Sequence, residues 1–322
     1  MNRIKFLLVV TLSLMMIAGF SVFGIASSFP EKNITIIQPW SAGGVTDTLT
    51  RALANIAEQF VNVSILVQNK SGGGGAVPFS FGAQAKPDGY TATITSVEYV
   101  IQPLMQEVPY AYDDYRPVMR VFNGPATITV RADAPWNTLE EFLNDARNKP
   151  EEFIGSGSPT GASWNMAALA LQDKANVKFT WDPSTGMAPA VAQLLGGHID
   201  FVSGSLAEVI PQVEAGNFKI LAIFSQERSE DFPDVPTVRE SGYDLVLGSW
   251  NGIQVPKDTP DDVVNILHNI FKKAYFSEEF AEILDNLSLK PAYMGPEDFA
   301  IYINESNKVY KPLVEKFNLK SN

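Results

Sequence analysis

Strand-like and helix-like segments alternate along most of this sequence, and glycine-rich turns separate several of them. β-Branched residues recur over 33–38, 62–68 and 91–96, which predicts three strands. Apolar residues at helical spacing lie between the first two strands, over 45–60, and a shorter helix is expected to end near residue 84. This strand–helix–strand–helix–strand order predicts a parallel sheet with right-handed crossovers.

The alternation is interrupted near residue 128 and again near residue 247. Between these points we expect strands at 126–132, near 154, 199–202 and 219–224, helices at 138–148, from 163 and from 187, and a short helix in the loop 232–245. After them we expect a strand at 248–255 and helices at 260–276, 277–287 and 296–317. The prediction is an α/β protein whose first lobe, 27–128 and 247–322, carries an inserted second lobe, 129–246. The chain would pass between the two lobes twice, and these two connections would form a hinge beside a ligand cleft.

The first 26 residues have the features of a signal peptide. Arg3 and Lys5 precede an apolar run, and small residues at 24–26 offer a cleavage site after Ala26. An uncleaved membrane anchor is the alternative, which the short apolar run disfavours. The formal charge of −12 becomes −14 without this segment, so we expect neither nucleic acid nor anionic lipid as a partner.

The chain contains no cysteine. This absence excludes disulfides, thiolate catalysis, cysteine-bound zinc and a lipidated N-terminal cysteine. A secreted protein that captures solutes without an anchor would diffuse away from a cell with a single membrane. We therefore expect a free, monomeric protein in a periplasm.

Three glycine-rich loops stand at predicted helix starts, where unpaired N–H groups and the helix dipole attract anions. In the first loop, glycines leave the backbone open to a ligand, hydroxyls add donors and an aspartate could cap the helix. The alternative is that the glycines only permit tight turns. The expected ligand contacts are Ser41, Ala42, Gly43, Gly44, Thr46 and Asp47 in the first loop, Gly73 and Gly74 in the second, Ser158, Thr160 and Ser163 in the third, and Thr185 and Ser205 elsewhere.

Signals for catalysis, metal binding or cofactor binding are weak. The two histidines, His198 and His268, lie in separate elements without metal-ligand spacing, and no Gly-x-Ser-x-Gly motif occurs. In the second loop Val77 replaces the third glycine of a dinucleotide-binding motif, so we expect no nucleotide, cofactor or metal. Trp40 stands beside the first loop, Trp164 at the start of the helix after the third loop, and Trp250 where the chain is expected to pass between the lobes for the second time. We expect these tryptophans to line the cleft.

Several segments, taken in order, resemble the extracytoplasmic solute receptors of the tripartite tricarboxylate transporter family. They are "IIQPWSAGGVTD" followed by "RALA", "VQNKSGGGGA", "KPDGYT", "GSGS", "APAVAQLLGGHIDF", "VEAGNFKILAI", "ERSEDFPDVPTVRESGYD" and "GSWNGIQVPKDTP". The resemblance implies a two-lobed periplasmic binding protein fold (type II-like), each lobe a mainly parallel sheet flanked by helices. It also implies closure on a small organic carboxylate, held through the first two glycine loops, and delivery to a tripartite-type membrane permease.

The sequence departs from the family pattern in the second lobe. Ser163, Trp164 and Asn165 stand where the family often has a histidine, and Ser184-Thr185-Gly186 replaces a frequent Tyr-Lys-Gly. The loss of a cation disfavours a ligand with two or three carboxylates, and favours a monocarboxylate or an aromatic carboxylate stacked on Trp40. Two alternatives to a transport receptor remain: a receptor that mainly signals through a sensor partner, and a secreted hydrolase with an oxyanion hole in a glycine loop.

Overall fold

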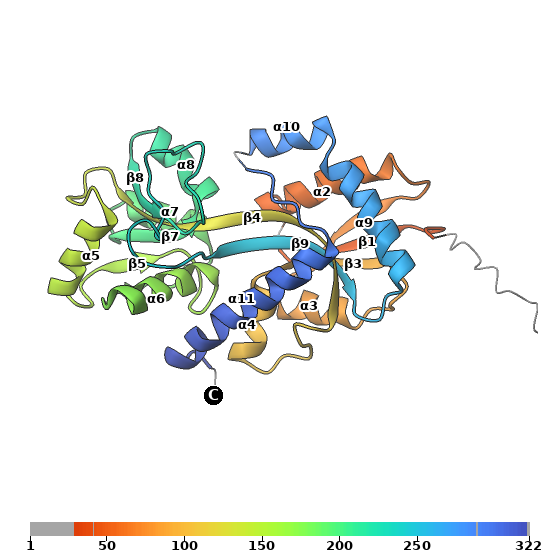
Figure 1. The fold of residues 1–322 in the computed structure, drawn as a ribbon, viewed down its shortest axis with the longest axis horizontal. Helices are drawn as coiled ribbons and strands as arrows, with labels where there is room; N and C mark the ends of the chain where they lie inside the picture. Colours follow the sequence, from red (N-terminus) through yellow and green to blue (C-terminus); the bar gives the residue numbers. More distant parts are fainter. Residues whose placement is uncertain (1–28, 41, 288, 321–322) are drawn as a thin grey trace, which may run out of the picture.

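The computed structural model describes residues 29–40, 42–287 and 289–320 (Figure 1). The strands are β1 (Ile34–Gln38), β2 (Ile65–Asn69), β3 (Thr91–Ser96), β4 (Tyr115–Arg131), β5 (Ile154–Ser156), β6 (Thr180–Trp181), β7 (Phe201–Ser205), β8 (Phe218–Ile223) and β9 (Gly248–Pro256). The helices are the 3₁₀ turn η1 (Gly73–Gly75) and α2 (Val45–Glu58), α3 (Ala76–Ala83), α4 (Glu98–Met105), α5 (Leu139–Asn148), α6 (Ser163–Ala175), α7 (Met187–Leu195), α8 (Leu206–Glu214), α9 (Asp261–Tyr275), α10 (Glu278–Asn286) and α11 (Pro296–Lys316).

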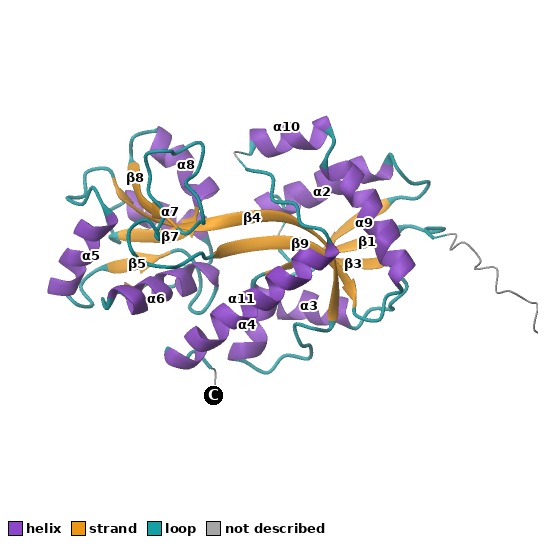
Figure 2. Ribbon diagram, in the orientation of Figure 1, coloured by secondary structure: helices purple, strands orange, loops and turns teal. Residues whose placement is uncertain are grey.

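The parallel arrangement predicted for the first three strands is confirmed. β1 pairs in parallel with β2 on one side and with β3 on the other. Ile34, Ile36 and Ile37 of β1 are buried, because helices cover this sheet on both faces (Figure 2). Each of these strands therefore delivers its carboxyl end, and the loop that follows, to the same edge of the sheet.

Two long antiparallel strands, β4 and β9, join the first sheet to the rest of the molecule. β4 pairs with β9 from Tyr115 to Pro125, and then with β7 and β8 from Ala126 onward. At the change of partners the backbones approach so closely that a Cβ on Gly248 would lie 2.3 Å from the carbonyl oxygen of Gly124. We refer to residues 29–125 and 248–320 as the first half, and to residues 126–247 as the second half.

In the second half, parallel strands β6, β5 and β7 lie beside β4, and β8 pairs with the other edge of β4. The complete sheet thus has the strand order β2-β1-β3-β9-β4-β7-β5-β6. The architecture is the mixed α/β fold with helix-flanked sheets that the sequence predicts. The antiparallel connection through β4 and β9 is the feature that strand periodicity alone does not reveal.

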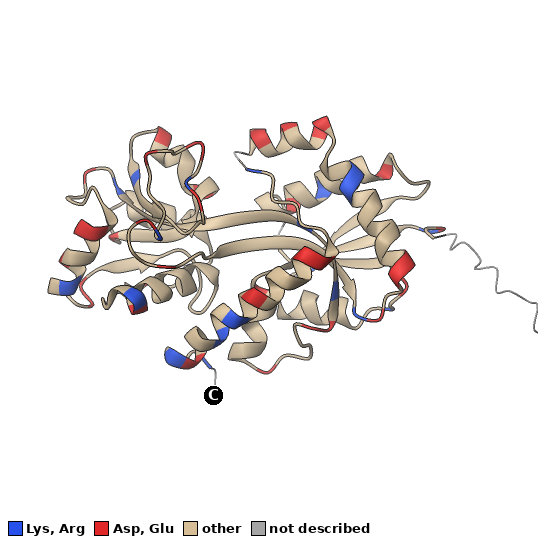
Figure 3. Cartoon of the chain, viewed as in Figure 1, with Lys and Arg blue, Asp and Glu red and all other residues tan. Residues whose placement is uncertain are grey.

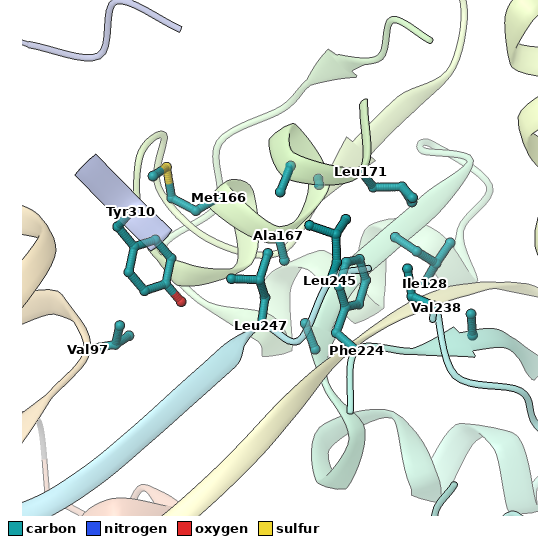
Figure 4. Packing of buried hydrophobic residues seen from close by; sticks show 14 of the residues in the cluster. Val97, Ile128, Met166, Ala167, Leu171, Phe224, Val238, Leu245, Leu247 and Tyr310 are labelled. Atoms are coloured by element: carbon teal, nitrogen blue, oxygen red, sulfur yellow. The ribbon is translucent and has the colours of Figure 1, made fainter. Parts of the chain in front are cut away.

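A continuous apolar cluster crosses the junction between the halves. It includes Val97 of the first half, Met166 and Leu171 of α6 in the second half, and Tyr310 of α11 (Figure 4). The Tyr310 hydroxyl also donates to the carbonyl oxygen of Gly248, 3.2 Å away. Helix α11 therefore supports the junction from the side of this shared core.

Two helices were absent from the sequence prediction, and one predicted helix is wrong. α4 and α8 each contain an internal proline, Pro103 and Pro211, and each follows directly on a strand, so their apolar residues read as a continuation of that strand. The short helix expected within 232–245 is replaced by turns, where Pro233 and Pro236 remove backbone donors. β4 also begins eleven residues before the predicted strand at 126.

The predicted signal peptide, residues 1–26, lies outside the described residues. Within the described part, no helix combines the length and the apolar character needed to cross a membrane. Charged residues lie mainly on the outer helices and loops (Figure 3).

Candidate ligand-binding cavity

The principal cavity has a volume of about 770 Å³ and is lined by residues of both halves. The first half contributes the loop before α2, the second glycine loop, one side of α4 and parts of β4 and β9. The second half contributes the loops that precede α6 and α7, the end of β7 and the first turn of α8. This volume is in the range of pockets that enclose a small molecule.

Four helices begin at this cavity, and the first turns of three of them, α2, α7 and α8, have no side-chain cap. In α6 the Asn165 amide donates to the Ser158 hydroxyl. The N-cap residues of α2, α6, α7 and α8 are Gly44, Ala162, Gly186 and Ser205, and none of their side chains caps its helix. In the described part of the chain, no residue accepts a hydrogen bond from the amides of Gly44, Val45 or Thr46. Each helix start carries a partial positive charge of about half a unit. The cavity therefore favours an anion although no basic side chain lines it among the described residues.

A buried network fixes the first loop. The Asp47 carboxylate accepts hydrogen bonds from the Gly43 amide at 3.0 Å, Arg51 Nε at 3.0 Å and Asn69 Nδ2 at 2.8 Å. Asn69 Nδ2 also donates to the carbonyl oxygen of Trp40 at 2.9 Å. Burial by itself would raise the pKa of Asp47, but these three donors lower it below the ordinary value. The network ties the loop to the end of β2 and to the second turn of α2.

This network corrects two predicted ligand contacts. Asp47 is 3% exposed and the Gly43 amide donates to its carboxylate, so both belong to the support of the loop rather than to the cavity lining. Gly43 has φ +87°, a conformation that a residue with a Cβ rarely adopts. Ala42, Gly44 and Thr46 do line the cavity, whereas Ser41 lies outside the described residues.

The second glycine loop reaches the cavity through Gly74 but not through Gly73. Gln102 of α4 donates from its side-chain amide to the carbonyl oxygens of both glycines, and the Tyr110 hydroxyl donates to Gln102 Oε1 at 3.3 Å. Gly74 has φ +62°. α4 therefore determines how this loop is presented, a role that the sequence analysis did not assign because it did not predict α4.

The third loop lines the cavity with Ser158, Thr160 and Ser163, as its sequence suggests. The Ser158 hydroxyl accepts a hydrogen bond from the Asn165 amide at 3.1 Å, so it partly serves the loop itself. The Ser163 hydroxyl donates to Glu98 of α4 at 2.9 Å, a hydrogen bond that links the two halves across the cavity. Thr185 and Ser205, at the starts of α7 and α8, also line the cavity.

The three tryptophans predicted to line the cleft have different surroundings. Trp164, near the start of α6, lines the cavity. Trp40 lies in the wall of the cavity and packs edge-on against Phe79. Trp250 is 1% exposed and packs against Tyr99 and Phe299 in the shared core, so the prediction that it lines the cleft is wrong. Its strand β9 nevertheless reaches the cavity, through residues 249 and 251.

Several polar residues of the cavity wall were not predicted. Asn251 of β9 accepts a hydrogen bond from the Thr46 hydroxyl at 3.4 Å. Glu98 begins α4, and Glu208 lies in the first turn of α8. The only signal for Glu208 in the sequence is the Ser-x-x-Glu spacing from Ser205, which is typical of a helix start. No group of three or more potential metal ligands occurs among the described residues.

Comparisons with known proteins agree with this architecture. Residues 49–319 match the family described as "Tripartite tricarboxylate transporter family receptor". A Cupriavidus necator protein, "UPF0065 protein in gbd 5'region", is 32% identical over 297 residues, which cover 91% of this chain and 90% of that protein.

Solved structures similar to this chain include proteins of the same family. A crystal structure of a TctC solute binding protein from Polaromonas, without ligand, has 37% identity and a TM-score of 0.81, covering 90% of this chain and 100% of that chain. An R. palustris protein solved with adipate shares the fold at 23% identity, with a TM-score of 0.78, covering 89% of this chain and 97% of the other. Members of this family are periplasmic solute-binding receptors and not enzymes. The chain belongs to the tripartite tricarboxylate transporter receptor family.

Proposed function

We propose that this protein captures a small organic carboxylate in the cavity between its halves and delivers it to a tripartite-type membrane permease. The observation that carries the proposal is the convergence of four helix N-termini, three of them without a side-chain cap, on one cavity of about 770 Å³. Uncharged backbone donors that face an enclosed space bind an anion without a neighbouring lysine or arginine. The adipate found in the R. palustris neighbour belongs to the same chemical class.

The carboxylate binds, in this proposal, at the start of α2. The open amides of Gly44, Val45 and Thr46 lie there together with the Thr46 hydroxyl, and Asn251 lies next to that hydroxyl. The Asp47 network holds this loop in place, so the donors are oriented before the ligand arrives. Preorganised donors cost little ordering on binding, which raises the affinity.

In this proposal the connection between the halves allows them to close around the ligand. Residues 27–128 and 247–322 act as one lobe and residues 129–246 as the other, with β4 and β9 as the hinge, and closure buries the ligand. The closed form, in a monomer secreted through a signal peptide cleaved after Ala26, then presents a surface to the permease. Neither the signalling role nor the hydrolase alternative is favoured by a specific feature of the cavity.

The proposal is tested by isothermal titration calorimetry of the mature protein, unfolded and refolded first to remove any bound solute. A panel of mono-, di-, tri- and aromatic carboxylates supplies the ligands. Thr46→Val removes one donor and is expected to weaken the best carboxylate about tenfold, because a hydrogen bond to a charged group contributes roughly 1.5 kcal/mol or more.

Thr48→Val is the matched control, since Thr48 lies on the same helix, is exposed and does not line the cavity. Its affinity should equal that of the wild type. Equal loss of affinity in both variants, or no carboxylate that binds, would contradict the proposed site.

A further inference from the structure

A second, smaller cavity lies beside the principal one and has a volume of about 210 Å³. The first half contributes residues of β4 between 120 and 125 and the loop 289–292, and the second half contributes the start of α8 and the loop after β8. This second cavity therefore lies between the halves, where β4 changes its strand partners. The residues that line both cavities, and so form a shared wall, are Phe122, Ser205, Ala207 and Leu289.

Arg120 of β4 lines the second cavity and carries a positive charge that no described carboxylate pairs with. The residue is only 9% exposed. Its Nε donates to the carbonyl oxygen of Ala292 at 2.7 Å, and its guanidinium carbon lies 4.7 Å from the centre of the Tyr302 ring. Both neighbours are neutral. Burial lowers the pKa of Arg120 from its ordinary value, because the charged form loses hydration.

The other arginines in the described part of the chain all pair with a carboxylate. Their side chains are each at least 34% exposed, so water also compensates their charge. A buried charge without a counter-charge is costly, and Arg120 is the arginine that most needs one. The pairs are Arg51–Asp47, Arg116–Asp261, Arg131–Asp133, Arg147–Glu140, Arg228–Glu240 and Arg239–Asp244.

The second-half wall adds donors that also lack partners. Ser205 is 4% exposed, and no described residue forms a hydrogen bond with its hydroxyl. A Cβ on Gly124, which lines only the second cavity, would lie 3.3 Å from this hydroxyl, so the hydroxyl lies on that side of the shared wall. The amides of Leu206 and Ala207 begin α8 without a side-chain cap or a described acceptor. Such a helix start adds about half a positive charge.

Two acidic side chains, Glu227 and Asp231, also line the second cavity. Neither is among the described ion-pair partners of Arg120. Asp231 pairs with Lys290 at 2.9 Å, so these two charges neutralise each other. Glu227 is exposed, and water and dissolved salt weaken the effect of its charge. The buried part of the cavity therefore keeps the uncompensated charge of Arg120.

We propose that the second cavity binds a small inorganic anion, a halide or an oxyanion of the size of phosphate, through the Arg120 guanidinium, the Ser205 hydroxyl and the first amides of α8. A volume of about 210 Å³ is below the usual range of pockets for organic ligands, which begins at roughly 300 Å³. The bound anion contacts both halves at the point where β4 passes between them. This site goes beyond the proposed function, and its existence does not depend on the identity of the organic ligand.

The experiment measures the stability of the mature wild-type protein, unfolded and refolded first in a bulky organic sulfonate to remove bound inorganic anions. Urea unfolding is then followed at neutral pH and constant ionic strength while chloride, bromide or phosphate replaces the sulfonate in steps. For at least one of these anions the free energy of unfolding should rise with the logarithmic dependence of a single site. The halide and phosphate arms distinguish the two kinds of anion.

Three variants assign the response to the second cavity. Arg120→Met removes the charge at similar volume and should abolish the response. Ser205→Ala should weaken the anion about tenfold, because it removes one hydrogen bond to a charged group. Arg239→Met is the matched control, since Arg239 pairs with Asp244, is 46% exposed in its side chain and lines neither cavity. It should keep the wild-type response.

Diffraction locates the anion directly. Crystals of the wild-type protein grown with bromide should show an anomalous peak within hydrogen-bonding distance of the Arg120 guanidinium and the Ser205 hydroxyl. If phosphate is the only anion that stabilises the protein, phosphate density is expected at the same place. This measurement and Ser205→Ala decide the matter if Arg120→Met does not fold.

Three results would overturn the site. One is an anion response that is the same in Arg120→Met and in the wild type. Another is an anion found only in the principal cavity. The third is a wild-type protein that does not respond to anions while Glu227→Gln does, because Glu227 would then be the counter-charge of Arg120 in solution.

Discussion

The Asp47 network offers the sharpest test of how the first loop is built. Asp47→Asn keeps the shape of the side chain but removes its charge and one of its two acceptor oxygens. Three donors now converge on the carboxylate: the Gly43 amide, Arg51 Nε and Asn69 Nδ2. An asparagine leaves at least one of them without an acceptor and places an NH₂ group against it.

We expect Asp47→Asn to lower the free energy of unfolding substantially, because the Asp47 carboxylate is buried. The Asp47 side chain is 4% exposed, whereas that of Arg51 is 43% exposed and can regain water when the pair is broken. One lost charge-assisted hydrogen bond and two weakened ones amount to about 3 kcal/mol. A destabilisation of this size lowers the melting temperature of a domain of 150–250 residues by roughly 6–12 °C, and somewhat less for a longer chain.

The assay is urea unfolding at several pH values. The native pKa of Asp47 lies below its ordinary value, so its charge stabilises the native state above about pH 4, and this contribution is lost as the pH falls through the native pKa. The stability gap between wild type and Asp47→Asn should therefore be full at neutral pH and shrink in acid.

Asp133→Asn is the control, since Asp133 forms an exposed ion pair with Arg131. Its unfolding curve should match that of the wild type. An Asp47→Asn variant with the wild-type urea midpoint at neutral pH would refute this account of the loop, as would a gap that does not depend on pH.

Two further predictions concern the core and the cavity. Gly75→Ala should destabilise the fold by about 2 kcal/mol or more, measured by urea unfolding, because its φ is +107° and its Cβ would lie 2.4 Å from Phe79 Cε2. Gly161→Ala should weaken ligand binding in calorimetry, because Gly161 lines the cavity at φ +79°, a conformation that alanine rarely adopts, so the substitution should shift the third loop.

Gly216→Ala serves as the matched control for both glycine variants. Gly216→Ala introduces a Cβ at φ +73° with no atom within 4 Å, so it isolates the effect of backbone strain from that of collision. A Gly161→Ala variant that binds as tightly as Gly216→Ala would show that the conformation of the third loop at Gly161 is not needed for binding.

The order of strands and helices, and hence the α/β class, could be predicted from the sequence because periodicity and turn residues are local properties. The same local signals placed Trp40, Gly44, Thr46, Gly74 and the third loop at one edge of the sheets, where they do line the cavity. Helix starts preceded by glycine are recognisable in any fold, since their backbone donors lack intrahelical partners.

Only the tertiary structure decided which of these donors are available. The Gly43 amide is occupied by Asp47, which is oriented by Asn69, a residue 22 positions away at the end of another strand. Glu98 and Glu208 enter the cavity from helices whose internal prolines obscure them in the sequence, and Glu98 accepts a hydrogen bond from Ser163 of the other half. Hydrogen-bond partners and hydration are set by neighbours in space, so a linear pattern identifies the candidate donors and acceptors but not the ones left free for a ligand.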